Sequence, residues 1–347
     1  MDYSQILSKQ FNIKEEYAKN IITLLDDGNT IPFIARYRKE MHGSMDDQLI
    51  REFAEKLEYL RGLDKRRDEI RSLIDAQEKL TDEINLALDK AATLSELEDI
   101  YRPYRPKRKT RASIAKEKGL EPLANDILKQ EKGFDPSKSA VDYIDEEKGV
   151  TSVEDAIQGA MDIIAELVSD NAEIRKRIRN LTNANGVLVS VATDEEKDSV
   201  YKNYYDYKEP VKKIAGHRVL AVNRGEKEGF LKVSVETDSE KPLNSIFRAM
   251  ITDKNQLCSD IIREACTDAY QRLIYPSIER EVRNDLTDTA SENAMKVFAV
   301  NLKQLLMQPP VKGKTVLALD PGYRTGCKTA VVDSTGKVLD TTVIYPK

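Results

Sequence analysis

The chain has 347 residues, 40% of them hydrophobic, which is enough for two or three domains with buried cores. Charged residues make up 33% of the chain and the net charge is -5, so it is no polycation and nucleic-acid contact would need a local basic patch. Three cysteines without a paired spacing argue against a disulfide framework, and two histidines argue against a His-based triad or metal site. No cofactor is predicted. No apolar run approaches the roughly 18 residues of a membrane helix, and the first residues lack the regions of a signal peptide, so a cytoplasmic protein without membrane contact is predicted.

The first third of the chain has the apolar spacing of helices. One helix is predicted over 17–25, with Gly28 at the expected C-cap, and a second segment starts after a turn at 31–38. A long apolar stripe over 49–74 predicts one extended helix or two consecutive ones. Residues 1–60 have some helix-turn-helix character, although a plain helical bundle is the simpler interpretation.

In the middle of the chain the period of the apolar residues changes twice. Thr151 and Glu154 fit a capping box ahead of one long amphipathic helix over 153–181. A β-branched run over 186–191 predicts a strand, and the runs 218–222 and 230–235 around two glycines predict a β-hairpin. Helical spacing then returns from Leu257 to Leu305 and is ended by Pro309 and Pro310.

Three strands are predicted at the carboxyl side, over 315–319, 328–332 and 338–345. Asp320 follows the first of them, which is where ribonuclease-H-like enzymes place their first metal-binding acid. One carboxylate cannot hold two Mg²⁺ ions, so no catalytic or metal site is predicted in this chain, and Asp320 stays a candidate only for a longer protein. Its alternative role is a strand-end cap that bonds to the turn of Gly322–Gly326.

A basic segment runs from Arg102 to Lys118, with Glu117 as its one acid. Pro103 and Pro106 favour extended backbone, along which basic side chains can follow a phosphate backbone while Tyr101 and Tyr104 stack on unpaired bases. Such binding is independent of sequence and falls steeply with salt. The alternative is a solvated loop that pairs with neighbouring acids. The predicted nucleic-acid-binding residues are Arg102, Arg105, Lys107, Arg108, Lys109 and Arg111.

Other side chains are interpreted as structural. His42 and His217 are expected to be hydrogen-bonded loop histidines, Cys258 and Cys266 helical core residues, and Cys327 a buried or half-buried strand residue. The tyrosines of 201–207 are expected to pack against helices, with base stacking as the alternative.

Four segments resemble signatures of the Tex family of transcription accessory proteins, and they occur in the family's order. They are Ile31–Glu40 (IPFIARYRKE), Leu97–Arg111 (LEDIYRPYRPKRKTR), Tyr275–Glu281 (YPSIERE) and Leu319–Cys327 (LDPGYRTGC). One segment alone would be a weak match, whereas four in order are specific.

The apolar patterns predict a mainly α, elongated protein with a small β insertion. The resemblance implies a helical N-terminal region with helix-turn-helix character and the first strands of an incomplete ribonuclease-H-like domain of YqgF type. The expected domains are 1–185, 186–310 and 311–347, followed in the family by helix-hairpin-helix elements and an S1 domain. The implied function is that of a transcription accessory factor that acts as a non-catalytic scaffold. Its expected partners are RNA or DNA, bound without sequence specificity, and the transcription machinery.

Two other functions remain open at this point. One is a ribonuclease-H-like nuclease in the full-length protein, and the other is a protein-interaction scaffold that docks on transcription or translation machinery. The strands of 315–345 are expected to leave one edge unpaired, so they should dock on preceding helices, pair with a second copy, or stay disordered.

Overall fold

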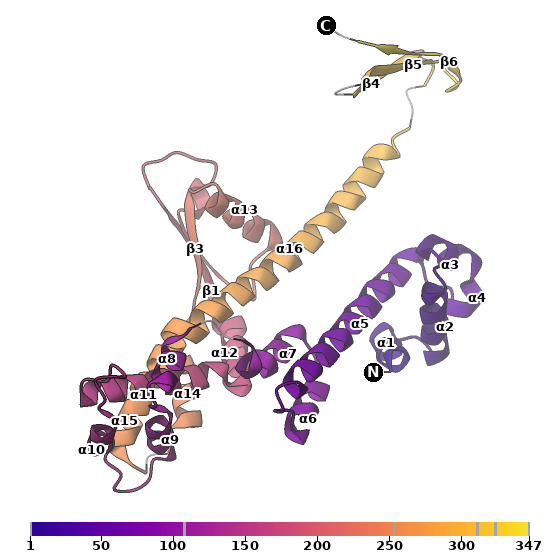
Figure 1. Cartoon of the computed structure of the whole chain (residues 1–347). Helices are drawn as coiled ribbons and strands as arrows, with labels where there is room; N and C mark the ends of the chain where they lie inside the picture. Colours follow the sequence, from indigo (N-terminus) through magenta and orange to yellow (C-terminus); the bar gives the residue numbers. More distant parts are fainter. Residues whose placement is uncertain (1, 107–108, 253, 310–311, 323–324, 346–347) are drawn as a thin grey trace. The chain divides into compact units, whose positions relative to one another are not determined.

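The computed structural model describes residues 2–106, 109–252, 254–309, 312–322 and 325–345. The chain divides into two compact units (Figure 1). The first contains Met1–Ile214 and Gly225–Asp285, and the second Ala215–Arg224 and Leu286–Lys347. Among the described residues, no helix combines the length and apolarity that crossing a bilayer requires.

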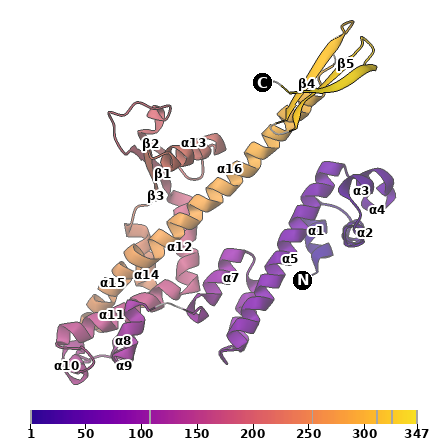
Figure 2. The same ribbon diagram turned by 45° about the horizontal axis from the view of Figure 1, so that its top comes forward.

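The first unit begins with short helices that pack beside the first half of a long one (Figure 2). Asp2 accepts a bond from the Gln5 amide and caps the first helix, and Gly28 has a φ of 78° at the end of the second, as predicted. The stripe over 49–74 forms one continuous helix, because its apolar residues keep a 3.6-residue period without a breaker. The elements are α1 (Tyr3–Phe11), α2 (Glu15–Asp26), α3 (Ile31–Tyr37), α4 (Lys39–His42) and α5 (Asp47–Asp75).

The second half of α5 packs on α6 (Asp82–Lys90) and α7 (Leu94–Tyr101) around a second apolar core. Arg67 is 4% exposed there and donates to the carbonyl oxygens of Leu88 and Ala91 at 2.8 and 2.9 Å. Tyr101 belongs to the same core and is 5% exposed. The expectation that Tyr101 stacks on a base is therefore wrong, because its ring is buried in this core.

The next part of the first unit is built around α11 (Val153–Asp170), which contacts α8 (Arg111–Glu117), α9 (Glu121–Lys129) and α15 (Gln256–Asp268). The long helix predicted over 153–181 is two helices, because Asn171 interrupts it and accepts a bond from the Ile174 amide at 3.0 Å as the cap of α12. The cap of α11 is Ser152 instead of Thr151. The elements are η1 (Arg102–Tyr104), α8 (Arg111–Glu117), α9 (Glu121–Lys129), α10 (Pro136–Ala140), η2 (Val141–Tyr143), α11 (Val153–Asp170) and α12 (Ala172–Asn185).

A three-stranded antiparallel sheet of order β2-β1-β3 follows α12. Its strands are β1 (Val187–Ala192), β2 (Asp206–Pro210) and β3 (Leu231–Glu236), and η3 (Lys202–Tyr204) precedes β2. The predicted hairpin is wrong, because 218–222 lies in α13 (Gly216–Lys227) and β3 pairs with β1. A five-residue apolar run fits a buried helix as well as a strand.

The sequence predicts that the tyrosines of 201–207 pack against helices. Tyr201 does so, since a Cβ on Gly225 of α13 would lie 3.1 Å from its ring, and it also lies 5.8 Å from Phe230 between ring centroids. Tyr204 instead lies 5.2 Å from Tyr207.

The helical spacing predicted from Leu257 to Leu305 is confirmed. The segment contains α15 (Gln256–Asp268), a π-helical turn η4 (Ala269–Ile274) and α16 (Tyr275–Leu306), with α14 (Glu240–Met250) before it. Pro276 has no amide hydrogen for the Arg272 carbonyl four residues earlier, which accounts for a widened turn at this place. Cys258 and Cys266 are fully buried core residues, as expected.

The second unit contains part of α13, the later part of α16 and a meander of order β4-β5-β6. Asn223 donates to the Thr287 hydroxyl at 2.8 Å, and a Cβ on Gly216 would lie 3.2 Å from the Ala290 Cα, so the two helices approach closely. The strands are β4 (Val316–Gly322), β5 (Gly326–Val332) and β6 (Val338–Ile344). The residues of β4 and β6 are exposed, whereas Cys327 on β5 is 8% exposed.

The architecture of helices with small antiparallel sheets confirms the mainly α fold with a partial β region.

Candidate nucleic-acid interface

The basic segment is less extended than its prolines suggest. Arg102–Tyr104 forms the 3₁₀ turn η1, which tolerates Pro103 near its start, and Arg105 is the residue with extended backbone, at φ -68° and ψ 132°. Arg111 begins α8, whose cap Thr110 accepts a bond from the Ser113 amide at 3.0 Å. The expected extended strand is therefore wrong at η1 and at α8. The predicted residues Lys107 and Arg108 lie outside the described residues.

The described basic side chains fall into two groups. Arg105, Lys109 and Arg111 are exposed, and Lys109 lies 3.7 Å from Glu117 with a side chain that is 70% exposed. Lys116 and Lys118 instead contact Glu121 and the carbonyl oxygen of Gly149, at 3.2 and 2.7 Å. The Lys109–Glu117 pair is the longer and more exposed of the two lysine pairs and contributes little stability, so the first group has the most charge available to a phosphate backbone.

Arg102 differs from its neighbours because it points into the protein. Its side chain is 34% exposed, and its Nε donates to Asp170 Oδ1 at 3.3 Å. Burial lowers the pKa of Arg102, and the like charge of Arg175 lowers it further, while Asp170 and Asp99 oppose both effects. Arg102 therefore holds the basic segment to α11 and lies against a second guanidinium.

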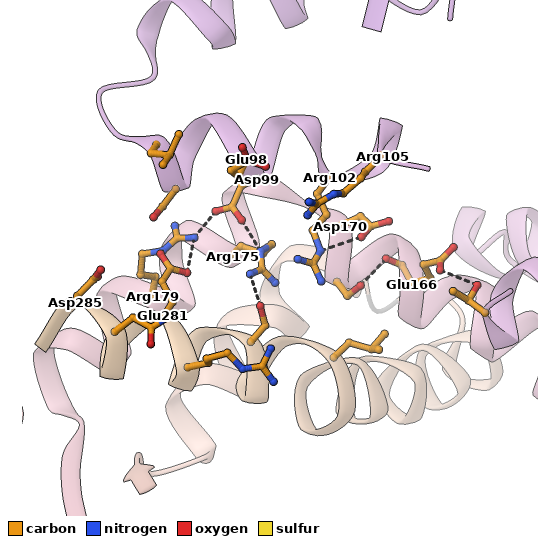
Figure 3. Close-up of a pocket in the computed structure, with 18 residues that line it drawn as sticks. Glu98, Asp99, Arg102, Arg105, Glu166, Asp170, Arg175, Arg179, Glu281 and Asp285 are labelled. Carbon is orange, nitrogen blue, oxygen red and sulfur yellow. Dashed lines mark hydrogen bonds and ion pairs between the residues drawn. The ribbon is translucent and has the colours of Figure 1, made fainter. Parts of the chain in front are cut away.

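Arg102 lines a cavity of about 770 Å³ in the first unit (Figure 3). The cavity walls come from α7, η1, α11, α12, η4 and α16. Sequence reasoning missed this site, because the residues that form it are spread over almost 200 positions. Its arginines are Arg102, Arg105, Arg175, Arg179 and Arg280, and its carboxylates are Glu98, Asp99, Glu166, Asp170, Glu281 and Asp285.

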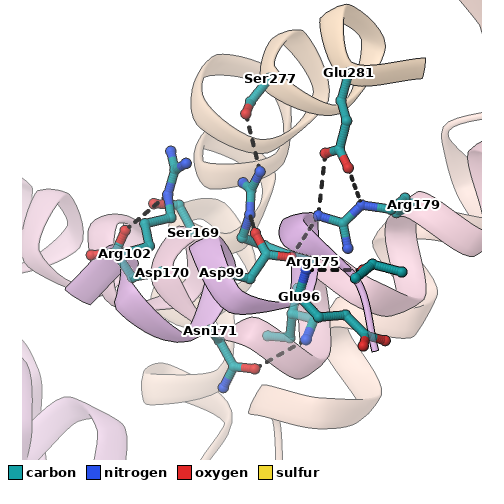
Figure 4. A network of polar contacts seen from close by, with 12 residues as sticks. Glu96, Asp99, Arg102, Ser169, Asp170, Asn171, Arg175, Arg179, Ser277 and Glu281 are labelled. Carbon is teal, nitrogen blue, oxygen red and sulfur yellow. Dashed lines mark hydrogen bonds and ion pairs between the residues drawn. The ribbon is translucent and has the colours of Figure 1, made fainter. Parts of the chain in front are cut away.

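A buried network of ion pairs forms part of the cavity wall (Figure 4). Asp99 accepts from Arg175 Nε and from Arg179 Nη2, both at 2.5 Å. Arg179 Nε also donates to Glu281 at 2.6 Å, and Arg175 Nη2 donates to the Ser277 hydroxyl at 3.0 Å. Burial lowers the pKa of Arg179, but its bonds to Glu281 and Asp99 outweigh burial and raise it overall. Arg175 and Arg179, four residues apart on α12, thus join α7 to α16.

Two of the four signature segments meet in this network. Asp99 belongs to Leu97–Arg111, whereas Ser277 and Glu281 belong to Tyr275–Glu281. The signal that could have found the site is the arginine pair on the buried side of an amphipathic helix, since arginine is buried almost only when it is paired.

The carboxylate candidate Asp320 does not join this site. It lies within β4, two residues before the end of the strand, and its Cα partner across the ladder is Lys328. Within the described ranges no three His, Cys, Asp or Glu side chains converge where a metal ion would fit.

Both histidines lie in helices, so the expectation of loop histidines is wrong. His42, in α4, is buried; its Nε2 lies 3.0 Å from the Ile34 carbonyl oxygen, and its Nδ1 has no hydrogen-bond partner among the described residues. His217 is exposed on the first turn of α13.

Comparison with known proteins gives one consistent family. Three family models match in order: the Tex-like protein N-terminal domain at 1–75, the Tex central region-like model at 131–298 and the Tex protein YqgF-like domain at 314–347. The uncharacterized protein YdcI of Bacillus subtilis is 46% identical over 345 residues, which cover 99% of this chain and 48% of that protein.

More distant relatives agree with this assignment. The protein tex of Bordetella pertussis is 38% identical over 100% of this chain and 46% of its own length. The human S1 RNA-binding domain-containing protein 1 is 32% identical over 99% of this chain and 36% of its own length. The chain thus spans about half the length of the bacterial relatives it matches, and on these matches it belongs to the Tex family.

Proposed function

We propose that this chain is a nucleic-acid-binding transcription accessory factor that acts as a scaffold without catalysis of its own. The observation that carries the proposal is the exposed set Arg105, Lys109 and Arg111. Neither Arg105 nor Arg111 forms a salt bridge among the described residues, and the one salt bridge of Lys109 is long. Burial raises the pKa of Asp162, and the charges of Arg272 and Arg111 oppose this effect. Relatives named transcriptional accessory protein Tex and S1 RNA-binding domain-containing protein 1 support the same role.

Binding through these residues is expected to be independent of sequence. They offer charge and no aromatic platform, since Tyr101 is buried and Tyr104 packs against the core of α5 to α7. Contacts of this kind read phosphate groups and release counterions, so affinity falls as salt rises.

The test is a titration of fluorescent single-stranded RNA, single-stranded DNA and duplex DNA at two salt concentrations. The triple variant Arg105→Gln, Lys109→Gln and Arg111→Gln should bind at least about tenfold more weakly, and the salt slope for single strands should fall by roughly 2, since each lost phosphate contact removes about 0.7. The control Lys9→Gln, Lys65→Gln and Lys138→Gln removes the same charge from exposed positions elsewhere. Equal affinity of the two triple variants, or no binding by the parent chain, would refute the proposal.

The enzyme alternative is a ribonuclease-H-like nuclease, which the YqgF-like match at 314–347 raises. Incubation of the chain with labelled RNA and DNA in Mg²⁺ separates the two functions. We expect intact strands, and cleavage abolished by Asp320→Asn would establish the nuclease instead. Salt-independent binding to a protein of the transcription machinery, without nucleic-acid affinity, would establish the protein-docking scaffold.

A further inference from the structure

The strongest unexplained feature of the first unit is a buried arginine nitrogen beside the cavity. Arg175 has a side chain that is 3% exposed, and two of its three nitrogens are bonded: Nε donates to Asp99 and Nη2 to the Ser277 hydroxyl. Its Nη1 is buried and has no hydrogen-bond partner. An unsatisfied buried donor is costly, more so when it carries charge, so this nitrogen favours an acceptor that the protein itself does not supply.

A second guanidinium lies next to it. Figures 3 and 4 both show Arg102 beside Arg175 at the cavity. Arg102 uses its Nε for Asp170, and among the described residues no other side chain or carbonyl accepts from it. Two adjacent cations in a poorly solvated place repel each other, and an anion between them removes the repulsion.

The neighbouring carboxylates do not fill this position. Asp99 is taken by Arg175 and Arg179, and Glu281 accepts twice from Arg179. The Ser277 hydroxyl accepts from Arg175 Nη2, which leaves its own proton for a ligand. Of the other lining carboxylates, Glu98 accepts from Arg66, Glu166 from Thr110 and Asp170 from Arg102. In Arg102, Arg175 and Ser277, the donors without an acceptor among the described residues are the Ser277 proton, Arg175 Nη1 and the two Nη groups of Arg102.

From this arrangement we infer that the cavity binds a phosphate monoester, held by Arg102, Arg175 and Ser277. Forked guanidinium groups bond phosphate oxygens in pairs, and a monoester carries about -1.5 to -2 charge at neutral pH. The volume of about 770 Å³ accommodates a nucleotide-sized group. The described lining residues include no aromatic side chain, so we expect phosphate and sugar to be recognised without stacking of the base.

This site differs from the proposed binding along a nucleic-acid backbone, because a phosphate monoester occurs only as a terminal phosphate. That phosphate belongs either to a nucleic-acid end or to a free nucleotide. The test compares a 5′-phosphorylated with a 5′-hydroxyl oligonucleotide of the same sequence, with AMP and inorganic phosphate as competitors and as ligands in isothermal titration.

The expected result is that the 5′-phosphate tightens binding by at least about tenfold, the worth of one charge-assisted bond. Arg102→Gln and Ser277→Ala should remove this preference. The matched control is Arg71→Gln, whose side chain is 32% exposed and ion-paired with Asp68 and Asp89 on α5 and α6. Arg175→Lys keeps the positive charge but loses the paired donors of the guanidinium group, so it should also weaken the preference for the 5′-phosphate. Circular dichroism establishes that this variant folds.

If AMP binds in an Arg102-dependent way while the 5′-phosphate adds nothing, the ligand is a free nucleotide and the inference stands. If neither the oligonucleotide phosphate, AMP nor inorganic phosphate shows Arg102-dependent binding, the inference is wrong. Binding of the 5′-hydroxyl strand tests the proposed function separately when it is measured with Lys109→Gln and Arg111→Gln, because these two residues do not line the cavity, whereas Arg105 does.

Discussion

Replacing Asp99 by Asn tests the buried ion-pair network directly. Asp99 is 4% exposed and accepts from two guanidinium groups at 2.5 Å, and its side-chain partners Arg175 and Arg179 are 3% and 11% exposed. The substitution keeps the shape and removes the charge, so two buried cations lose their shared counterion. Breaking a buried pair on one side costs about 3–5 kcal/mol, and because the amide oxygen still accepts one bond we expect about 3 kcal/mol.

Hydrogen exchange measured by mass spectrometry on peptides of α7 and α12 is the suitable assay, since it reports the local opening free energy. A loss of about 3 kcal/mol corresponds to roughly 100-fold faster exchange. The control Asp68→Asn removes an acid whose side chain is 71% exposed and which lies 2.6 Å from Arg71. It should cost less than about 0.5 kcal/mol.

A companion variant makes the result diagnostic. Arg175→Met in the Asp99→Asn background should recover part of the lost protection, because it removes the guanidinium that loses its carboxylate partner, whereas Arg179 keeps its bonds to Glu281. If Asp99→Asn and Asp68→Asn speed exchange equally, the network does not stabilise the junction of α7, α12 and α16, and the reasoning is refuted.

Three further outcomes follow from the remaining contacts. The pKa of Glu96 is lowered, mainly by the hydrogen bond that it accepts from Lys176, so the stabilisation from this pair is present above the unfolded pKa of about 4.3 and is lost as pH falls through the folded pKa. Glu96→Gln should therefore lower the free energy of unfolding in urea by about 0.5 kcal/mol at pH 7 and by less at pH 4. An equal loss at both pH values would contradict the assignment. Burial raises the pKa of the Cys266 thiol to about 12, so a thiol reagent at pH 8 should modify it only after unfolding, and rapid native modification would show that the site opens. Leu317 and Leu339 are 61% and 54% exposed on the outer strands of the β4-β5-β6 sheet; changing both to Lys should reduce self-association in light scattering, whereas equal monomeric masses for parent and variant would exclude pairing between copies.

Much of the helical architecture could be predicted from the sequence, because the buried face of a helix follows from the spacing of apolar residues within the helix itself. The continuous α5 follows from its apolar period, and the end of the long helical segment follows from Pro309 and Pro310. The meander of β4, β5 and β6 was likewise visible from alternating β-branched runs and the turn at 334–336. The domain boundaries after 185 and 310 stay a prediction.

The errors arose where short segments allow two structures. The run 218–222 fits a helix or a strand, and only pairing decides, since β1 takes β2 and β3 as its neighbours. The helix break at Asn171 was missed because one capping side chain separates two amphipathic segments of the same period.

By itself the sequence determined the family, the abundance of helix and the position of the basic segment, because these depend on local order and on motifs in a row. Only the tertiary structure decided which charges are available. It turned Arg102 inward to Asp170, left Arg105 and Arg111 exposed, and brought Asp99 to Arg175 across 76 positions. Ion pairs and cavities depend on distances in space, and charged residues on a solvated face and in a buried network look alike in the sequence until their partners are known.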